Sequence, residues 1–137
     1  MTTICCDLSN MASDSLASDG ATSNAVQKIW RIRKQLVGIA GAYADCCAFI
    51  TWLKAGGDGD DAPDFENVSA LVLNGSGIWV YDGHPMPFKV KDGFCAVGSG
   101  AQAAMAGLHM GLTPKEAVRI AAKIDPATGG RTVGRKL

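Results

Sequence analysis

Short apolar runs alternate with turn residues in the N-terminal part of the chain, which is the pattern of β-strands. Residues 3–8 (TICCDL) predict an opening strand, and a second short strand is expected at residues 11–13. Residues 14–24 are rich in Ser, Asp and Gly and predict turns. The alternating KIWRI (28–32), a short RKQ turn and the apolar LVGIAG (36–41) then predict a β-hairpin.

The apolar period changes to that of a helix after this hairpin. Residues 42–55 predict a helix, because apolar side chains recur at helical spacing at Cys46, Phe49, Ile50 and Leu53. The pair Gly56-Gly57 that follows is expected to end this helix. Residues 56–67 follow as a segment rich in Gly, Asp and Pro. Because its acidic residues lack the glycine that a calcium loop has at its sixth position, we expect a solvated loop rather than a metal site.

Strands return in the next part of the chain. Residues 69–74, 78–82 and 94–98 predict an antiparallel meander, with a turn between the first two strands and a longer excursion before the third. A helix of small residues is expected from about Gly100 to Met110.

The last predicted element is a helix that begins at Thr113, with Pro114 at its first position and Glu116 completing a capping box. Its apolar stripe is predicted to be Ala117, Ile120, Ala121 and Ile124. The order of strands, one helix, more strands and a helical pair predicts an α+β domain over residues 1–137, in which two packed antiparallel sheets have helices outside.

Composition restricts the functional class. The 137 residues suffice for one domain, and 47% hydrophobic and 19% charged residues are typical of a globular protein. Thirteen basic residues balance thirteen acidic ones, so no overall field favours nucleic acid or an anionic membrane. The basic run at residues 31–34 is expected to be a solvated strand edge. The sequence predicts neither a membrane span nor a signal peptide, and we expect a cytoplasmic protein.

Cysteine and histidine do not form a metal-site pattern. The cysteines are odd in number and include two adjacent pairs, so they predict buried small hydrophobes in a reducing compartment rather than disulfides: Cys5, Cys6, Cys46, Cys47 and Cys95. His84 and His109 are isolated from complementary ligands. We therefore expect no metal and no organic cofactor.

Thr2 is the first candidate for chemistry. Removal of Met1 is expected, because threonine is small, and it would place an amine and a hydroxyl on one residue, so that the amine could accept the hydroxyl proton. Lys28 on a strand could lower the pKa of either group, and Asp14 could orient the lysine. Taken singly, Lys28 also fits an ordinary surface lysine on a strand, and Asp14 also fits an ordinary turn residue. The segment 38–41 could direct a backbone N–H at an oxyanion.

Five segments in the same order resemble signatures of HslV, the bacterial proteasome-like peptidase. They are TTI at residues 2–4, an Asp in a small-residue turn at 12–15, QKI at 27–29, GIAGAYAD at 38–45 and AVGSG at 96–100. DPATGG at 125–130 is similar to the D-x-x-S-G-G signature of proteasome β subunits, with Thr128 in the place of serine.

The resemblance implies a fold and a set of roles. The fold would be the αββα four-layer sandwich of N-terminal-nucleophile (Ntn) hydrolases. The activity would be threonine-type peptidase activity on polypeptides within a homo-oligomeric ring. Whether an ATP-dependent unfoldase feeds the ring stays open from the sequence. Thr2 would be the nucleophile, Lys28 and Asp14 would tune it, and the Gly41 N–H would serve the oxyanion hole. The Thr2 amine would be supported by Ser99, Asp125 and Thr128.

The chain also departs from that family. Only the acidic loop stands where the family has a second long helix, so one outer helical layer is expected to be reduced to a single helix. The chain ends soon after residue 130, so the last strands are expected to be curtailed.

Three other interpretations stay open from the sequence. Residues 98–103 fit G-x-G-x-x-A, the phosphate-binding pattern of a dinucleotide site, although a second helix rather than a strand is predicted to follow. An inactive ring subunit that acts as a scaffold would share the fold. So would a non-peptidase Ntn amidohydrolase.

Overall fold

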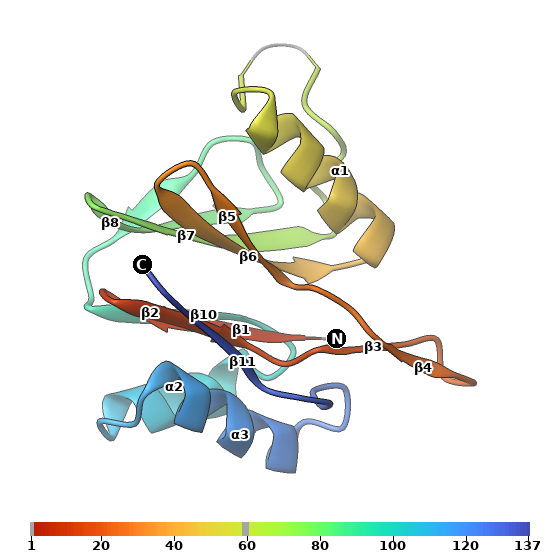
Figure 1. Cartoon of the computed structure of the whole chain (residues 1–137), viewed down its shortest axis with the longest axis vertical. Helices are drawn as coiled ribbons and strands as arrows, with labels where there is room; N and C mark the ends of the chain where they lie inside the picture. Colours follow the sequence, from red (N-terminus) through yellow and green to blue (C-terminus); the bar gives the residue numbers. More distant parts are fainter. Residues whose placement is uncertain (1, 59–60) are drawn as a thin grey trace.

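The computed structural model describes residues 2–58 and 61–137 as two antiparallel sheets stacked face to face between helices (Figure 1). The four-stranded sheet contains, in spatial order, β10 (Phe94–Gly98), β1 (Thr3–Asp7), β2 (Asn10–Ser13) and β11 (Val133–Lys136). The five-stranded sheet contains, in spatial order, β5 (Ile29–Ile32), β6 (Gln35–Gly41), β7 (Val68–Asn74), β8 (Gly77–Asp82) and β9 (Phe88–Val90). Helix α1 (Tyr43–Lys54) covers the second sheet, and α2 (Ala101–His109) and α3 (Pro114–Ile124) cover the first. The predicted four-layer α+β sandwich is confirmed.

Strand β1 is buried on both faces, which explains the apolar run Ile4-Cys5-Cys6 at its centre. Ile4 and Cys6 belong to the core between the two sheets, whereas Cys5 belongs to the core beneath α2 and α3. A strand that is covered on both sides has a continuous apolar run in place of alternation. Burial on both faces holds the chain start, with Thr2 next to the strand, in the middle of the sandwich.

The outer layer over the five-stranded sheet consists of α1 and a loop rather than two helices. Phe49 of α1 packs edge to face against Phe65 of the loop and Tyr81 of β8, with ring centroids 5.3 and 5.1 Å away. Phe65 is buried, so it anchors the loop on the sheet. The described parts of the loop contain no helix, and the predicted reduction of this layer is confirmed.

Three pieces of β-structure were not predicted from the sequence. β3 (Leu16–Ser18) and β4 (Ser23–Ala25) form a separate hairpin that projects from the sandwich, within the segment for which only turns were predicted (Figure 1). β9 lies within the excursion between the second and third predicted strands. β11 follows the DPATGG segment at residues 125–130. All are short and lack the alternation that a longer half-buried strand shows, so the apolar pattern could not reveal them.

Two predicted core positions are wrong. Ile124, the last residue of α3, is 66% exposed, and Val118 is fully buried instead, next to Ala117 and Ala121. The end of α3 extends past the residues it packs against, so Ile124 has nothing to cover it. Cys47 is exposed, because adjacent helix positions point in different directions and its neighbour Cys46 takes the buried one.

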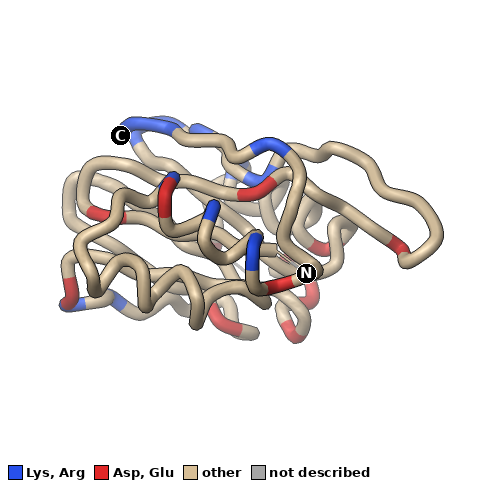
Figure 2. Tube along the Cα trace, turned by 90° about the horizontal axis from the view of Figure 1, so that it is seen from below, with Lys and Arg blue, Asp and Glu red and all other residues tan. Residues whose placement is uncertain are grey.

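The basic run at residues 31–34 covers the end of β5 and the turn to β6, as expected of a strand edge. The Arg31 guanidinium donates a hydrogen bond to the carbonyl oxygen of Lys136 in β11, so it joins the two sheets at this edge. Figure 2 shows Lys and Arg positions gathered near the C-terminus. Within the described ranges, no helix is both long and apolar enough to cross a membrane.

Candidate active site

Three side chains that are distant in sequence meet at the start of the chain. The Lys28 Nζ donates a hydrogen bond to the Thr2 Oγ1 over 2.8 Å, and it lies 3.0 Å from the Asp14 Oδ1. Thr2 precedes β1, Asp14 follows β2 and Lys28 precedes β5, so both sheets contribute. All three residues are buried. A cation is therefore held against the Thr2 hydroxyl oxygen, which is the geometry that favours loss of the hydroxyl proton.

The Asp14 carboxylate is held by the backbone as well as by Lys28. Its Oδ1 accepts a hydrogen bond from the Thr3 N–H over 3.1 Å, and its Oδ2 accepts one from the Gly129 N–H over 3.0 Å. A third N–H, that of Leu16, lies 3.4 Å from Oδ2. Because these donors belong to three separate segments, the carboxylate has one fixed orientation, and so has the lysine paired with it.

Burial dominates the electrostatics of Lys28. Removal of its ammonium from water lowers its pKa, and the charge and hydrogen bond of Asp14 offset part of this effect. A lysine whose pKa is lowered exchanges its proton more readily near neutral pH than a surface lysine does. The charged form of Lys28, with its Nζ 2.8 Å from the Thr2 Oγ1, is placed to stabilise a developing alkoxide on Thr2.

A second group of hydroxyls and a carboxylate lies on the other side of Thr2. The Thr2 nitrogen donates a hydrogen bond to the Ser99 Oγ over 3.0 Å, and Ser99 in turn donates to the Asp125 Oδ2 over 2.5 Å. The same carboxylate oxygen accepts a hydrogen bond from the Thr128 Oγ1 over 2.6 Å. Partial burial acts to raise the pKa of Asp125, but the bonds from Ser99, Thr128 and the Ala127 N–H outweigh it and hold the pKa below its usual range.

Thr3 is a member of this group that the sequence did not indicate. Its Oγ1 lies 2.7 Å from the Thr128 Oγ1. Because the single hydroxyl proton of Thr128 is donated to Asp125, the Thr3 hydroxyl must be the donor in this contact. No local signal could have identified Thr3, since its partner is 125 positions away and meets it only through the packing of the C-terminal segment against β1.

Two glycines shape the space around Thr2. Gly98 has a φ of +100°, and a Cβ placed on it would lie 2.1 Å from the Thr2 carbonyl oxygen. Gly41 has a φ of +138°, and a Cβ there would lie 2.0 Å from the Asn67 carbonyl oxygen. Gly41 also lines a cavity of about 260 Å³ that Thr2 and Lys28 border. The backbone at position 98 can therefore come close to Thr2, and the backbone at position 41 close to Asn67, only because both positions lack a side chain.

The glycine-rich segment after β10 serves this cluster and not a dinucleotide. Ser99 contacts Thr2 and Asp125, and β10 is followed by α2 and then α3 without an intervening strand in the fully described segment 94–124. The β-α-β unit that a dinucleotide site needs is thus missing from this segment. All seven candidate residues from the sequence lie around Thr2: six in the two hydrogen-bonded groups, and Gly41 on the wall of the cavity.

Solved structures share this architecture. A eukaryotic HslV from Trypanosoma brucei superimposes with a TM-score of 0.77 at 20% sequence identity, covering 99% of this chain and 99% of that chain. The chain has the HslV fold. Thiobacillus denitrificans BPH, solved in complex with epoxomicin and alone, gives a TM-score of 0.70 at 19% identity over 99% of this chain, with 97% and 96% of the BPH chain covered. No protein-family model and no curated protein matches the sequence.

The resemblance to HslV that the sequence indicates is thus confirmed for the fold. The similarity extends over nearly the whole of each chain. Met1, whose removal the sequence predicts, lies outside the residues that the structure describes.

Proposed function

We propose that this chain is a threonine-type endopeptidase whose nucleophile is Thr2 after removal of Met1. It hydrolyses peptide bonds in polypeptides, as a subunit of a homo-oligomeric ring. The observation that carries the proposal is the contact of 2.8 Å between the Lys28 Nζ and the Thr2 Oγ1, with Asp14 fixed behind the lysine.

A scaffold has no need of this contact. Burying a lysine beside a threonine hydroxyl costs free energy, as the lowered pKa of Lys28 indicates, and an apolar side chain would fill the same space without that cost. The shared fold alone would also suit an inactive ring subunit. The buried Lys28–Thr2 contact therefore favours the active form over the inactive one.

The mechanism is acyl transfer through a covalent ester. The Thr2 Oγ1 attacks the carbonyl carbon of the substrate, and its proton passes to the Thr2 amine, directly or through water. Lys28 stabilises the alkoxide character of Oγ1, and the Gly41 N–H donates to the oxyanion. The amine returns the proton to the leaving nitrogen as the C–N bond breaks. Water then hydrolyses the ester and restores Thr2. Ser99, bonded to Asp125 and with Thr128 alongside, holds the amine in position.

Self-association into a ring would cover apolar side chains that the single chain leaves at its surface. The large exposed apolar side chains of the described residues include Leu8, Met86, Phe88, Met110 and Ile124. We expect light scattering of the purified protein to give a mass several times that of one chain. All five cysteines are unpaired, which suits the proposed cytoplasmic location.

The deciding experiment is intact mass spectrometry after incubation with epoxomicin, the compound bound by BPH in one of the similar structures. We expect a wild-type mass lower by one methionine residue, followed by addition of one compound per chain. Thr2→Ala should add none. Lys28→Ala should slow peptide hydrolysis by about 100-fold or more, the usual contribution of a positioned proton-transfer group, while Lys123→Ala at an exposed position should not. Full peptidase activity in purified Thr2→Ala protein would refute the proposal.

A further inference from the structure

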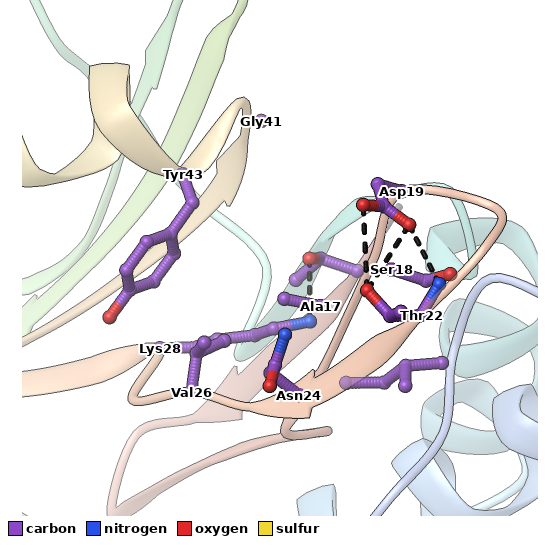
Figure 3. Close-up of a pocket in the computed structure, with 11 residues that line it drawn as sticks. Ala17, Ser18, Asp19, Thr22, Asn24, Val26, Lys28, Gly41 and Tyr43 are labelled. Carbon is purple, nitrogen blue, oxygen red and sulfur yellow. Dashed lines mark hydrogen bonds between the residues drawn. The ribbon is translucent and has the colours of Figure 1, made fainter.

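The cavity beside Thr2 continues along the β3–β4 hairpin, away from the buried lysine. Its volume is about 260 Å³, and Figure 3 shows the side chains that line it. Apolar surface comes from Leu16, Ala17, Val26 and the ring of Tyr43. The hairpin contributes a polar end made of Ser18, Asp19, Thr22 and Asn24. An occupant with an apolar stem and a polar head would match both parts.

The charge of this cavity is set by Asp19. Lys28 also lines it, but its charge is balanced by the Asp14 carboxylate at 3.0 Å. The Asp19 side chain has no cationic partner among the described residues; it accepts hydrogen bonds from the N–H groups of Thr22 and Ala21 over 2.8 and 2.9 Å. These bonds lower the pKa of Asp19, led by the one from Thr22, so the carboxylate is ionised at neutral pH. The cavity therefore carries one uncompensated negative charge.

On the basis of the proposed peptidase function, we propose that this cavity selects substrates with a Lys or Arg side chain next to the scissile bond, and that Asp19 determines this preference. Long basic side chains pack their methylene stems on apolar surface and keep the charged head in polar surroundings. Here the stem lies against Leu16, Val26 and Tyr43, and the head reaches the hairpin end of the cavity. Acidic side chains are disfavoured at the same position by repulsion from the Asp19 carboxylate.

The test uses pairs of fluorogenic peptides that differ in one residue, lysine or the uncharged norleucine, at each of the three positions before the scissile bond. At low salt, we expect wild-type kcat/KM to favour lysine about three- to fivefold at the position next to the scissile bond, the size usual for an exposed ion pair, and a preference only at one of the other two positions would contradict the proposal. The preference should shrink in 0.5 M NaCl, because salt screens an exposed charge.

Two variants of Asp19 separate its charge from the shape of the hairpin. Asp19→Ser keeps an oxygen that can accept the bonds of the turn but removes the charge, so the lysine-to-norleucine ratio should fall to about one. Asp19→Lys should reverse the ratio. Asp92→Asn, which removes an exposed acid outside the cavity, is the matched control and should keep the wild-type ratio.

The outcomes distinguish this proposal from the peptidase function on which it rests. Absence of hydrolysis for every peptide, together with absence of labelling by epoxomicin, would overturn both. Labelling or hydrolysis without a lysine preference would overturn the role of the cavity alone. So would a preference that persists in Asp19→Ser.

Discussion

The buried pair of Asp14 and Lys28 predicts unequal effects of removing its two members on stability. Asp14→Ala removes the acceptor of Lys28 and of the Thr3, Leu16 and Gly129 N–H groups. Breaking a buried pair costs about 3–5 kcal/mol, and a buried donor without an acceptor costs about 1–3 kcal/mol. Because Lys28 can lose its proton when unpaired, and water can reach the half-buried Leu16 and Gly129, we expect a total of about 4 kcal/mol.

Lys28→Met should be milder. The Asp14 carboxylate would keep its backbone N–H donors, and methionine would fill the space of the lysine stem, so we expect a loss of about 1–2 kcal/mol. The difference between the two variants, about 2–3 kcal/mol, is a large fraction of the 5–15 kcal/mol that holds a typical domain folded.

Urea unfolding at one fixed protein concentration measures this difference, since assembly would otherwise shift the midpoint. Lys123→Met, at an exposed position on α3, is the control and should stay within about 0.5 kcal/mol of the wild type. A Lys28→Met variant that loses as much stability as Asp14→Ala would show that the lysine, and not the backbone donors, holds the carboxylate in place.

Two further predictions concern Gly98 and Cys5. Gly98→Ala should slow labelling of Thr2 at least tenfold, because its Cβ would lie 2.1 Å from the Thr2 carbonyl oxygen, whereas Gly75→Ala, with open space around it, should label at the wild-type rate. Burial raises the pKa of Cys5 from 9.0 to about 12, so from pH 9 to 11 the unfolded chain releases a proton that the folded chain keeps. Stability should therefore fall with rising pH by about 1.4 kcal/mol per unit from this thiol, and Cys5→Ala should reduce the slope by that amount. Equal labelling of the two glycine variants, or an unchanged alkaline slope in Cys5→Ala, would contradict the respective argument.

The longer elements could be predicted because their sequence patterns are set by burial. Helix α1 buries one side on the sheet, so its apolar residues recur at helical spacing, and β6 and β7 are buried on both faces and read as apolar runs. The β3–β4 hairpin could not be predicted in this way. Its strands have three residues each, β4 is exposed throughout, and the hairpin packs on little besides itself, so no core imposes a pattern on it.

The candidate site shows a similar division. Apolar pattern and residue chemistry led to a layered α+β domain in which Lys28 could act on Thr2 and Asp14 could orient the lysine, and the resemblance to HslV carried more weight than this chemistry. Their meeting depends on the stacking of the two sheets, which brings the residue before β5 against the residue before β1. The contact of Thr3 with Thr128 depends likewise on how the C-terminal segment packs against β1, so the residues around Thr3 in the sequence could not predict it.

The free energy of the buried ion pair bears on why the chain keeps it. Burying a lysine and an aspartate together rarely stabilises a fold more than well-packed apolar side chains of the same volume would. The lowered pKa of Lys28 indicates that its charge is held at some cost even with Asp14 at 3.0 Å. If the pair served only to hold the sheets together, a double replacement by apolar residues would preserve both the fold and the reactivity of Thr2. We expect such a double variant to fold with a loss of about 1–3 kcal/mol, which comes from the buried Thr3 N–H that loses its acceptor, and to lose reactivity at Thr2. That combination would assign the pair to chemistry rather than to architecture.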